Sequence, residues 1–255
     1  MTENALVQMN REGNVMLLTM NRPERKNALN GEMYAALAAA IEQADQDAAV
    51  RAIVITGSGD AFSAGNDLAD FEKTGEVAVS PGAAFVRTLL HAKTPLLAAV
   101  NGMAVGIGVT MLAHCDLVYV AESARLRLPF TALGVVPEAG SSMLLPAIVG
   151  HRRAAELLLL GEFFTAPEAV EMGLANAACA DDQVLAQTLQ AAAKLASLPA
   201  GAVSETRRML KENFGAALEA RVEEEFSVFA RLLHSDDAAE ARAAFREKRL
   251  PVFNQ

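Results

Sequence analysis

The stretch Ala98–Ser142 decides the fold, and it reads AAVNGMAVGIGVTMLAHCDLVYVAESARLRLPFTALGVVPEAGSS. The apolar run 96–100 at its start is typical of a strand, and it stops at Asn101-Gly102. A helical pattern follows Gly106 and Gly108. Glycine lets a backbone turn sharply and approach a ligand, and the first amides of a helix have no partner within it. The stretch therefore predicts a strand, a glycine-rich turn and a helix start whose amides can hold an oxyanion.

A second break of the same kind lies upstream. The β-branched run Ile53–Thr56 predicts a strand, and the glycine-rich segment Gly57–Asn66 follows it. Two such breaks can aim two backbone amides at one point. Close packing of a helix on a sheet also selects glycine, so the pattern alone leaves the function open.

A single carboxylate, Glu138, lies between Pro137 and Ala139, just before the apolar run 143–149. This position predicts a helix N-terminus. The residue is either a catalytic carboxylate or a surface glutamate that interacts favourably with the helix dipole. The residue taken by itself does not decide between the two interpretations.

Four stretches carry a resemblance to one family: NRPERKNAL (Asn21–Leu29), FSAGNDL (Phe62–Leu68), AVNGMAVGIGVTMLAHCDLVYV (Ala99–Val120) and PFTALGVVPEAGSS (Pro129–Ser142). In order and spacing they resemble the crotonase, or enoyl-CoA hydratase/isomerase, superfamily, over essentially the whole chain. The closest resemblance is to its Δ3,Δ2-enoyl-CoA isomerase branch. The resemblance implies an α/β fold: a crotonase-like (ββα)n spiral core over residues 1–197 with the acyl-CoA site. Residues 198–255 would form a C-terminal helical region that covers coenzyme A and supports a homotrimer or a dimer of trimers.

The resemblance also implies the catalytic residues. The backbone amides of Asn66 and Ile107 would stabilise the enolate of a thioester, and Glu138 would move the proton. Hydratases of the family use two glutamates, and the corresponding positions here hold Thr110 and Phe130. Neither side chain can transfer a proton at neutral pH, so efficient hydration is not expected.

We therefore expect isomerisation of a 3-enoyl-CoA to a 2-trans-enoyl-CoA by one base. Two alternatives remain open. One is a hydratase or another crotonase reaction that uses Asp70 or Glu72 from a loop. The other is an acyl-CoA-binding protein without turnover.

Residues that would contact the substrate follow by resemblance. Basic side chains of the first loop, Arg22, Arg25 and Lys26, would form a rim for the coenzyme A phosphates together with Lys248 and Arg249. Phe245 and Phe253 flank the second group, while Ala64, Leu68 and Phe130 would line the substrate channel. Each charge can equally be a solvated one at a helix end.

Composition limits the other functions. The chain has 255 residues, 52% of them hydrophobic, and a formal net charge of −9, which disfavours a nucleic-acid partner. No apolar run reaches the roughly 20 residues of a membrane span, so a cytoplasmic location is expected. Cys115 and Cys179 suit a reducing compartment and structural roles. The four histidines lack metal-ligand spacing, so no metal or redox cofactor is expected, and coenzyme A would enter as the substrate thioester.

Hydrophobic periodicity predicts alternating strands and helices, an α/β layered core. The expected strands are 6–10, 15–20, 52–56, 96–100, 117–121 and, as the last one, 125–128. The expected helices are 29–44, 85–91, 109–114, 181–196, 201–214, 216–234 and 235–249, with a short helix from Asn66, a flexible loop over 75–82 and an almost wholly helical chain beyond Ser141.

Overall fold

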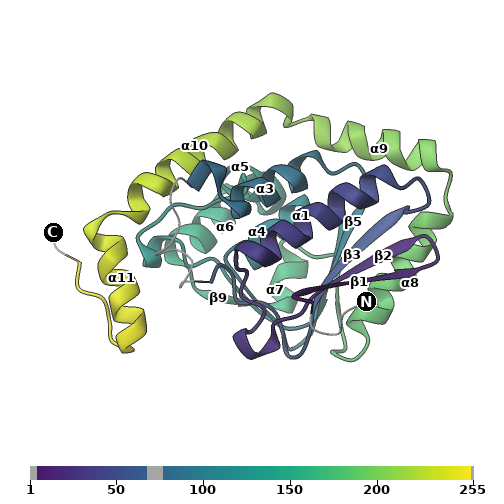
Figure 1. Ribbon diagram of the computed structural model, residues 1–255. Coiled ribbons are helices and arrows are strands. Elements are labelled where there is room, and N and C mark those ends of the chain that lie inside the picture. The colour runs from purple at the N-terminus through teal and green to yellow at the C-terminus, as the bar shows by residue number, and fades with distance from the viewer. Residues whose placement is uncertain (1–4, 68–76, 254–255) are drawn as a thin grey trace.

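The computed structural model describes residues 5–67 and 77–253 (Figure 1). The larger sheet has six strands in the order β1-β2-β3-β5-β7-β10. These are β1 (Val7–Glu12), β2 (Val15–Met20), β3 (Ala52–Gly57), β5 (Leu96–Val100), β7 (Leu117–Ala121) and β10 (Ala177–Cys179). Strands β1 and β2 form an antiparallel hairpin, and the other neighbours are parallel.

A second sheet of four strands runs beside the first and gives the core its spiral form. Its order is β4-β6-β8-β9, from β4 (Ala61–Ser63), β6 (Met103–Val105), β8 (Arg125–Arg127) and β9 (Phe163–Thr165). The chain passes from β3 to β4, from β5 to β6 and from β7 to β8, so each pass adds one strand to each sheet. This α/β arrangement confirms the predicted fold class.

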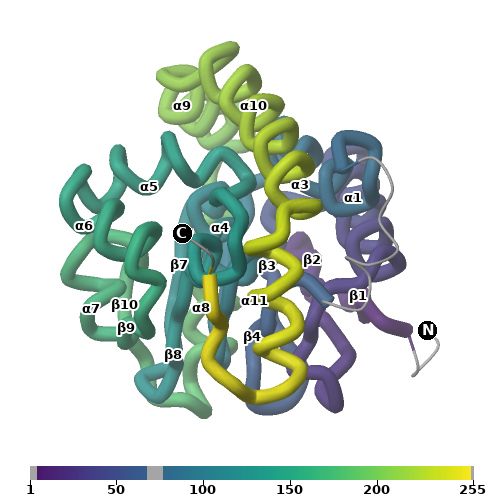
Figure 2. Tube along the Cα trace, turned by 90° about the vertical axis from the view of Figure 1, so that its left-hand side faces the viewer, coloured from purple at the N-terminus to yellow at the C-terminus, as the bar shows by residue number. Residues whose placement is uncertain are grey.

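Strand β3 shows why the central strands are apolar throughout. Ile53 and Ile55 face the main core, whereas Val54 faces a second core on the opposite side of the sheet. A parallel strand buried on both faces needs apolar residues at every position. Helices α1 (Gly31–Gln46) and α3 (Pro81–His91) contribute to the main core, and α8 (Val184–Ser197) covers the other face. In Figure 2, α1 and α3 lie to the right, where β1 and β2 are, whereas α5, α6 and α7 lie to the left, where β9 and β10 are.

The remaining helices follow in chain order. They are η1 (Pro23–Arg25), η2 (Val77–Val79), α4 (Ile107–Thr110), η3 (Met111–His114), η4 (Thr131–Leu133), α5 (Ser141–Val149), α6 (His151–Ala155), the π-helical turn η5 (Glu156–Leu160), α7 (Ala166–Glu171), α9 (Ala200–Glu212), α10 (Gly215–Leu233) and α11 (Asp236–Glu247). Helices α9 and α10 arch over the molecule, and α11 stands at one end of it (Figure 1). A capping box of Thr165 and Glu168 begins α7.

Several predicted elements were wrong. Strands β4, β6, β9 and β10 were not expected, so the chain beyond Ser141 is not wholly helical and 125–128 is not the last strand. Each missed strand has three residues, too few to show a period of two, and forms because a neighbouring strand is present. The end of the expected loop 75–82 is ordered as η2 and the start of α3. Asn66 pairs with Leu29 in an isolated bridge, and the rest of the helix expected from it falls outside the described residues.

Candidate active site

The two glycine turns lie side by side. Gly65 follows β4 and Gly106 follows β6, and these strands are parallel neighbours, so their carboxyl ends meet. A Cβ placed on Gly65 would lie 2.8 Å from the carbonyl oxygen of Val105. The φ angles of +91° at Gly65 and +55° at Gly106 are in the region that favours glycine. The contact between the turns therefore requires glycine at position 65.

The amides that follow the two glycines are available to a ligand. Ile107 is the first residue of α4, so its N–H has no partner within the helix. Within residues 5–67 and 77–253, neither this N–H nor that of Asn66 donates a hydrogen bond to a protein group. Two such donors on adjacent turns suit a developing oxyanion.

Glu138 lies beside the helix that carries Ile107. The hydroxyl of Thr110, the last residue of α4, donates a hydrogen bond of 2.8 Å to Oε1 of Glu138. Glu138 is only 8% exposed. The interpretation of this residue as a surface helix-start glutamate was therefore wrong, and its carboxylate lies next to the short helix that begins with Ile107.

The environment makes Glu138 a stronger base than an ordinary carboxylate. Burial raises its pKa to about 8; the Thr110 hydroxyl opposes this shift and the charge of Glu225 adds to it. The amides at the start of α5 do not bind the Glu138 carboxylate. Glu225 accepts hydrogen bonds from N–H of Gly140 (2.6 Å) and of Ser142 (3.0 Å), and the N–H of Ser141 donates to the backbone carbonyl of Glu138 (3.1 Å). Desolvation thus outweighs the helix start, a balance that the sequence left undecided.

The turn after Glu138 is fixed from both sides. Ala139 has a φ of +60°, which costs a residue with a Cβ about 1 kcal/mol. Nε2–H of His114 donates a hydrogen bond of 2.7 Å to the carbonyl of Ala139, and the hydroxyl of Ser141 donates one of 2.6 Å to that of Glu138. Burial lowers the pKa of His114 to about 4, so the ring is a neutral donor at neutral pH. These bonds hold the backbone of the candidate base.

Sequence reasoning missed two residues of the site. Tyr34 of α1 is buried and donates a hydrogen bond from its hydroxyl to Oδ1 of Asn66, and burial together with the charge of Glu138 raises its pKa. Glu225 of α10 is 5% exposed. The signal for Glu225 was its spacing, because it lies on the same helix face as the core residues Val222, Phe226 and Phe229. A carboxylate on such a stripe indicates a buried partner.

Part of the predicted substrate rim lies next to the glycine turns. The N–H of Ala64 donates a hydrogen bond of 2.8 Å to the carbonyl of Lys26. Arg25 and Lys26 are exposed, although Lys26 pairs with Asp60 at 2.5 Å. Arg22 pairs with Asp67 at 2.6 Å, so its charge is already compensated. Leu68, Asp70 and Glu72 lie outside the described residues.

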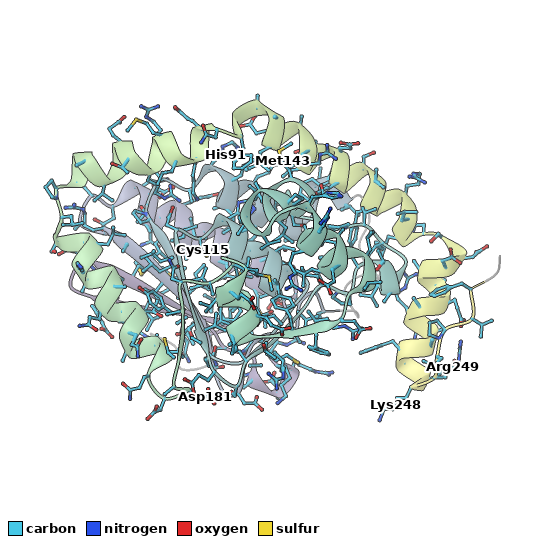
Figure 3. All side chains as sticks on the ribbon, turned by 180° about the vertical axis from the view of Figure 1, so that it is seen from behind. His91, Cys115, Met143, Asp181, Lys248 and Arg249 are labelled. Carbon is cyan, nitrogen blue, oxygen red and sulfur yellow. The ribbon has the colours of Figure 1, made fainter. Side chains whose placement is uncertain are left out.

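The other predicted contacts are placed elsewhere. Phe245 and Phe253 are 64% and 44% exposed, and Lys248 lies at the outer end of α11 (Figure 3). In the part of the chain that the structure describes, no hydrogen bond or ion pair joins them to the first loop. Arg249 pairs with Glu240 and Glu247. Phe130 is 4% exposed and packs in the main core.

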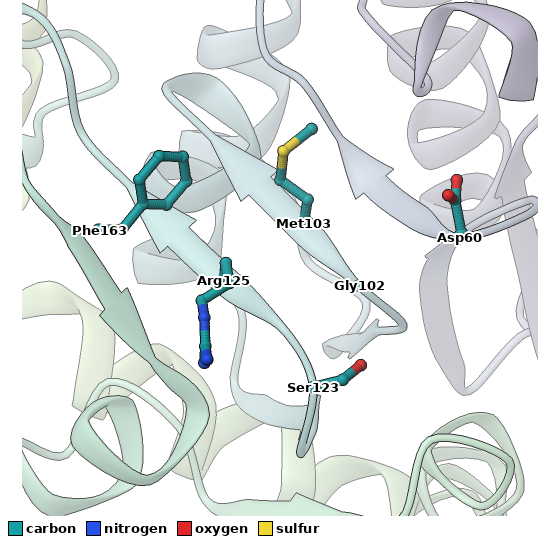
Figure 4. A pocket seen from close by; sticks show the side chains of 6 residues that line it. All are labelled: Asp60, Gly102, Met103, Ser123, Arg125 and Phe163. Carbon is teal, nitrogen blue, oxygen red and sulfur yellow. The ribbon is translucent and has the colours of Figure 1, made fainter.

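A separate hollow of about 450 Å³ does not include these groups. It is lined by Asp60, Gly102, Met103, Ser123, Arg125 and Phe163 (Figure 4). Arg125 and Phe163 are exposed whereas Leu126 and Phe164 beside them are buried, so the hollow lies on the outward face of the smaller sheet. Opposite charges, Asp60 and Arg125, line it, and Asp60 is already paired with Lys26.

Other features of the described residues can be stated briefly. They contain no cluster of three or more His, Cys, Asp or Glu side chains able to hold a metal ion. Among these residues, no helix combines the length and the apolar character needed to cross a membrane. Cys115 and Cys179 are both free thiols, and burial raises the pKa of Cys115 to about 12.

Known proteins resemble this chain over nearly its whole length. A family model described as enoyl-CoA hydratase/isomerase matches residues 10–255. The chain is 35% identical to 2,3-dehydroadipyl-CoA hydratase of Escherichia coli (96% of this chain, 97% of that protein) and 35% identical to enoyl-CoA delta isomerase 2 of Rattus norvegicus (92% and 61%). The crystal structure of an enoyl-CoA hydratase/isomerase from Pseudoalteromonas atlantica T6c superimposes with a TM-score of 0.94 at 42% identity, covering 98% of this chain and all of that one. The chain with the paired glycine turns and the buried Glu138 therefore belongs to the enoyl-CoA hydratase/isomerase family of the crotonase superfamily and is an acyl-CoA enzyme.

Proposed function

We propose that the protein isomerises 3-enoyl-CoA thioesters to 2-trans-enoyl-CoA, with Glu138 as the only base. The observation that carries this proposal is the contact between Glu138 and Thr110 on the short helix that begins with Ile107. It places one buried carboxylate beside the amides that suit a thioester oxygen. A double-bond shift needs one proton carrier and one oxyanion site.

Each step of the reaction can be assigned to groups of this chain. The amides of Asn66 and Ile107 bind the thioester oxygen. Glu138 removes a proton from C2, and the electron pair moves into a dienolate whose negative charge the two amides stabilise. The protonated Glu138 then returns the proton to C4. No electron is gained or lost overall, so the reaction needs no redox cofactor, and the proposal assigns the stabilisation of the enolate to the two amides rather than to a metal ion. Coenzyme A arrives with the substrate.

The second carboxylate oxygen supports the assignment of the base. Thr110 donates to Oε1, and no hydrogen bond from residues 5–67 or 77–253 reaches Oε2. One oxygen can therefore be held while the other carries the proton between two carbons of the acyl chain.

Hydration is the second candidate, because the similar Escherichia coli protein is named a hydratase. Adding water requires activation of the water and protonation of carbon, for which the family's hydratases use two glutamates. Thr110 and Phe130 occupy those positions here. A hydratase would have to obtain its second acid from elsewhere, and Asp70 and Glu72 lie outside the described residues.

Purified protein mixed with a medium-chain 3-enoyl-CoA tests the proposal. We expect the ultraviolet absorbance of the conjugated thioester to rise and the product mass to equal the substrate mass. Glu138→Gln should lower the rate by several orders of magnitude. A product heavier by one water from a 2-enoyl-CoA, formed faster than the isomer, would identify a hydratase instead. No turnover of either substrate would favour the binding protein.

We also propose that copies of this chain assemble as a homotrimer or a dimer of trimers, as the family resemblance implies. Exposed apolar side chains such as Leu159, Leu160 and Phe163 are the kind of surface that such contacts cover. Sedimentation equilibrium measures the assembly, and a monomer at micromolar concentration would contradict it.

A further inference from the structure

We propose that Glu225 of α10 is a positioning residue for the base: it fixes the turn that carries Glu138 and holds a second carboxylate beside it. This inference rests on the proposed role of Glu138 as proton carrier. It assigns to the C-terminal helices an effect on the chemistry, beyond the covering and assembly roles that the family resemblance implies.

The carboxylate of Glu225 binds the backbone on both sides of Ser141, at the end of the turn. Its Oε2 accepts a hydrogen bond from N–H of Gly140 at 2.6 Å, and its Oε1 accepts one from N–H of Ser142 at 3.0 Å. Both carboxylate oxygens are thus engaged by backbone that follows directly after Glu138. Helix α10 also packs closely at this point, because a Cβ on Gly140 would lie 2.5 Å from Cδ1 of Leu218. The position of the turn therefore depends on α10.

The same contacts take away groups that would weaken the base. Amides at a helix N-terminus stabilise a nearby anion and so lower the pKa of a carboxyl group. Glu225 occupies the N–H groups of Gly140 and Ser142, which leaves the Thr110 hydroxyl as the donor to the side-chain carboxylate of Glu138 among the described residues. A second carboxylate nearby also disfavours ionisation of the first. Both effects act in the same direction as burial.

The titratable groups around this pair come from five elements. Tyr34 of α1 interacts with Glu138, and His114 of η3 bonds to the carbonyl of the next residue, Ala139; both side chains are neutral at neutral pH because burial shifts their pKa values. Burial raises the pKa of Glu225, and its hydrogen bonds to Ser142 and Gly140 together with the charge of Arg221 of α10 oppose that shift. Two further cations, Arg87 of α3 and Lys211 of α9, bind Glu223 and the carbonyl of His114 respectively. Glu225 is therefore the anion that acts on Glu138.

Two substitutions separate the effect of the Glu225 charge from the effect of its side-chain length. Glu225→Gln keeps the length of the side chain and removes the charge. Glu225→Asp keeps the charge and shortens the side chain, so the bonds to the turn weaken. Glu223→Gln on the same helix is the matched control, because this exposed residue also loses one negative charge but binds Arg87 rather than the turn.

The titration of Glu138 can be measured without any substrate. Carbon-13 NMR of protein labelled at glutamate carboxyls gives this pKa, and the signal is assigned by its loss in Glu138→Gln. We expect Glu225→Gln to lower the pKa of Glu138 by roughly half to one unit, and Glu223→Gln to leave it unchanged. Glu225→Asp should keep the pKa high but lower kcat by about tenfold at an unchanged KM.

An unchanged Glu138 titration in Glu225→Gln, together with full activity in Glu225→Asp, would overturn the inference. If Glu225→Gln does not fold, as judged by circular dichroism, the Glu225→Asp variant still tests the effect on the turn. The proposed function fails by a different result, since it requires turnover of 3-enoyl-CoA and its loss in Glu138→Gln. The NMR titration is independent of that result.

Discussion

The hydroxyl of Tyr34 donates a hydrogen bond to Oδ1 of Asn66, so helix α1 holds the residue whose backbone amide forms half of the proposed oxyanion site. Asn66 is also fixed through its backbone bridge to Leu29. Tyr34 itself is fixed by its ring, which lies 5.6 Å from that of Phe85. The direction of the Asn66 N–H is thus determined by contacts from three neighbouring segments.

Tyr34→Phe should lower kcat by about tenfold with little change in KM. Removal of the hydroxyl leaves Oδ1 of Asn66 without its partner, at a cost of about 1 to 3 kcal/mol, and lets the amide move away from the oxyanion. Steady-state kinetics with a 3-enoyl-CoA measure the effect. Tyr119→Phe, at the other tyrosine of the chain, is the control and should behave as the parent. Equal rates for all three proteins would show that Asn66 does not need Tyr34.

Thr110→Val should move the pH dependence of the reaction to higher pH. The hydroxyl of Thr110 stabilises the Glu138 anion, so its loss raises a pKa that is already about 8. Since the base must be ionised, kcat/KM of the parent should rise with pH up to about 8, and that of the variant should reach its plateau only at higher pH. Thr188→Val, at a buried threonine of α8 that bonds to Val184, should leave the profile unchanged. If the pH profiles of kcat/KM for Thr110→Val and the parent coincide, the hydrogen bond from Thr110 does not affect the pKa of Glu138.

The two glycines of the site should differ in their tolerance of alanine. A Cβ on Gly65 meets the Val105 carbonyl at 2.8 Å, whereas one on Gly106 meets nothing within 4 Å. We expect Gly65→Ala to separate the two turns and lower kcat/KM by about a hundredfold or more. Gly106 combines a φ of +55° with a ψ of −119°, so alanine there costs about 1 to 3 kcal/mol of stability, and Gly106→Ala should lose less activity than Gly65→Ala because its Cβ meets no atom of the other turn. Thermal melts and kinetics on both proteins test this order, and the reverse order would show that the turns are not in contact.

Glu138→Gln should be more stable than the parent at pH 8 but not at pH 4.5. The pKa of Glu138 is raised from 4.5 in the unfolded chain to about 8, so the folded protein binds the proton more tightly between these values. Its contribution to stability is therefore complete below pH 4.5 and is lost as the pH rises to 8. Glutamine does not ionise and avoids this loss, which is on the order of a few kcal/mol.

Urea unfolding of both proteins at several pH values measures the difference. The gap should widen steadily from pH 4.5 to 8. A gap that does not depend on pH would mean that Glu138 ionises in the folded protein as easily as in the unfolded chain.

The sequence predicted the central strands because burial on both faces of a parallel sheet makes their residues uniformly apolar. The runs 52–57, 96–100 and 117–121 are of this kind. Strands β4 and β6 carry no such signal, since their three residues form strands only by pairing with each other and with β8. The division into two sheets could therefore be reached only through the family resemblance.

The site was predictable where it depends on local sequence. Glycine followed by a helix start indicated where unpaired backbone amides lie, and the family resemblance then implied Asn66, Ile107 and Glu138 as the site residues. Tyr34 and Glu225 enter through contacts with residues distant in the chain, and a tyrosine or glutamate within a helix gives little sign of its partner. Only the packing of α1 and α10 in three dimensions brings Tyr34 to Asn66 and Glu225 to the turn after Glu138.

The dependence of the Glu138 turn on α10 has a consequence for biosynthesis. A chain leaving the ribosome can form the two glycine turns early, since both are encoded in its first half. The turn that carries Glu138 acquires its hydrogen bonds to Glu225 only after α10 has been translated and has docked. One of the last segments of the chain thus completes the site, and a nascent chain or one truncated before α10 lacks the contacts that position Glu138.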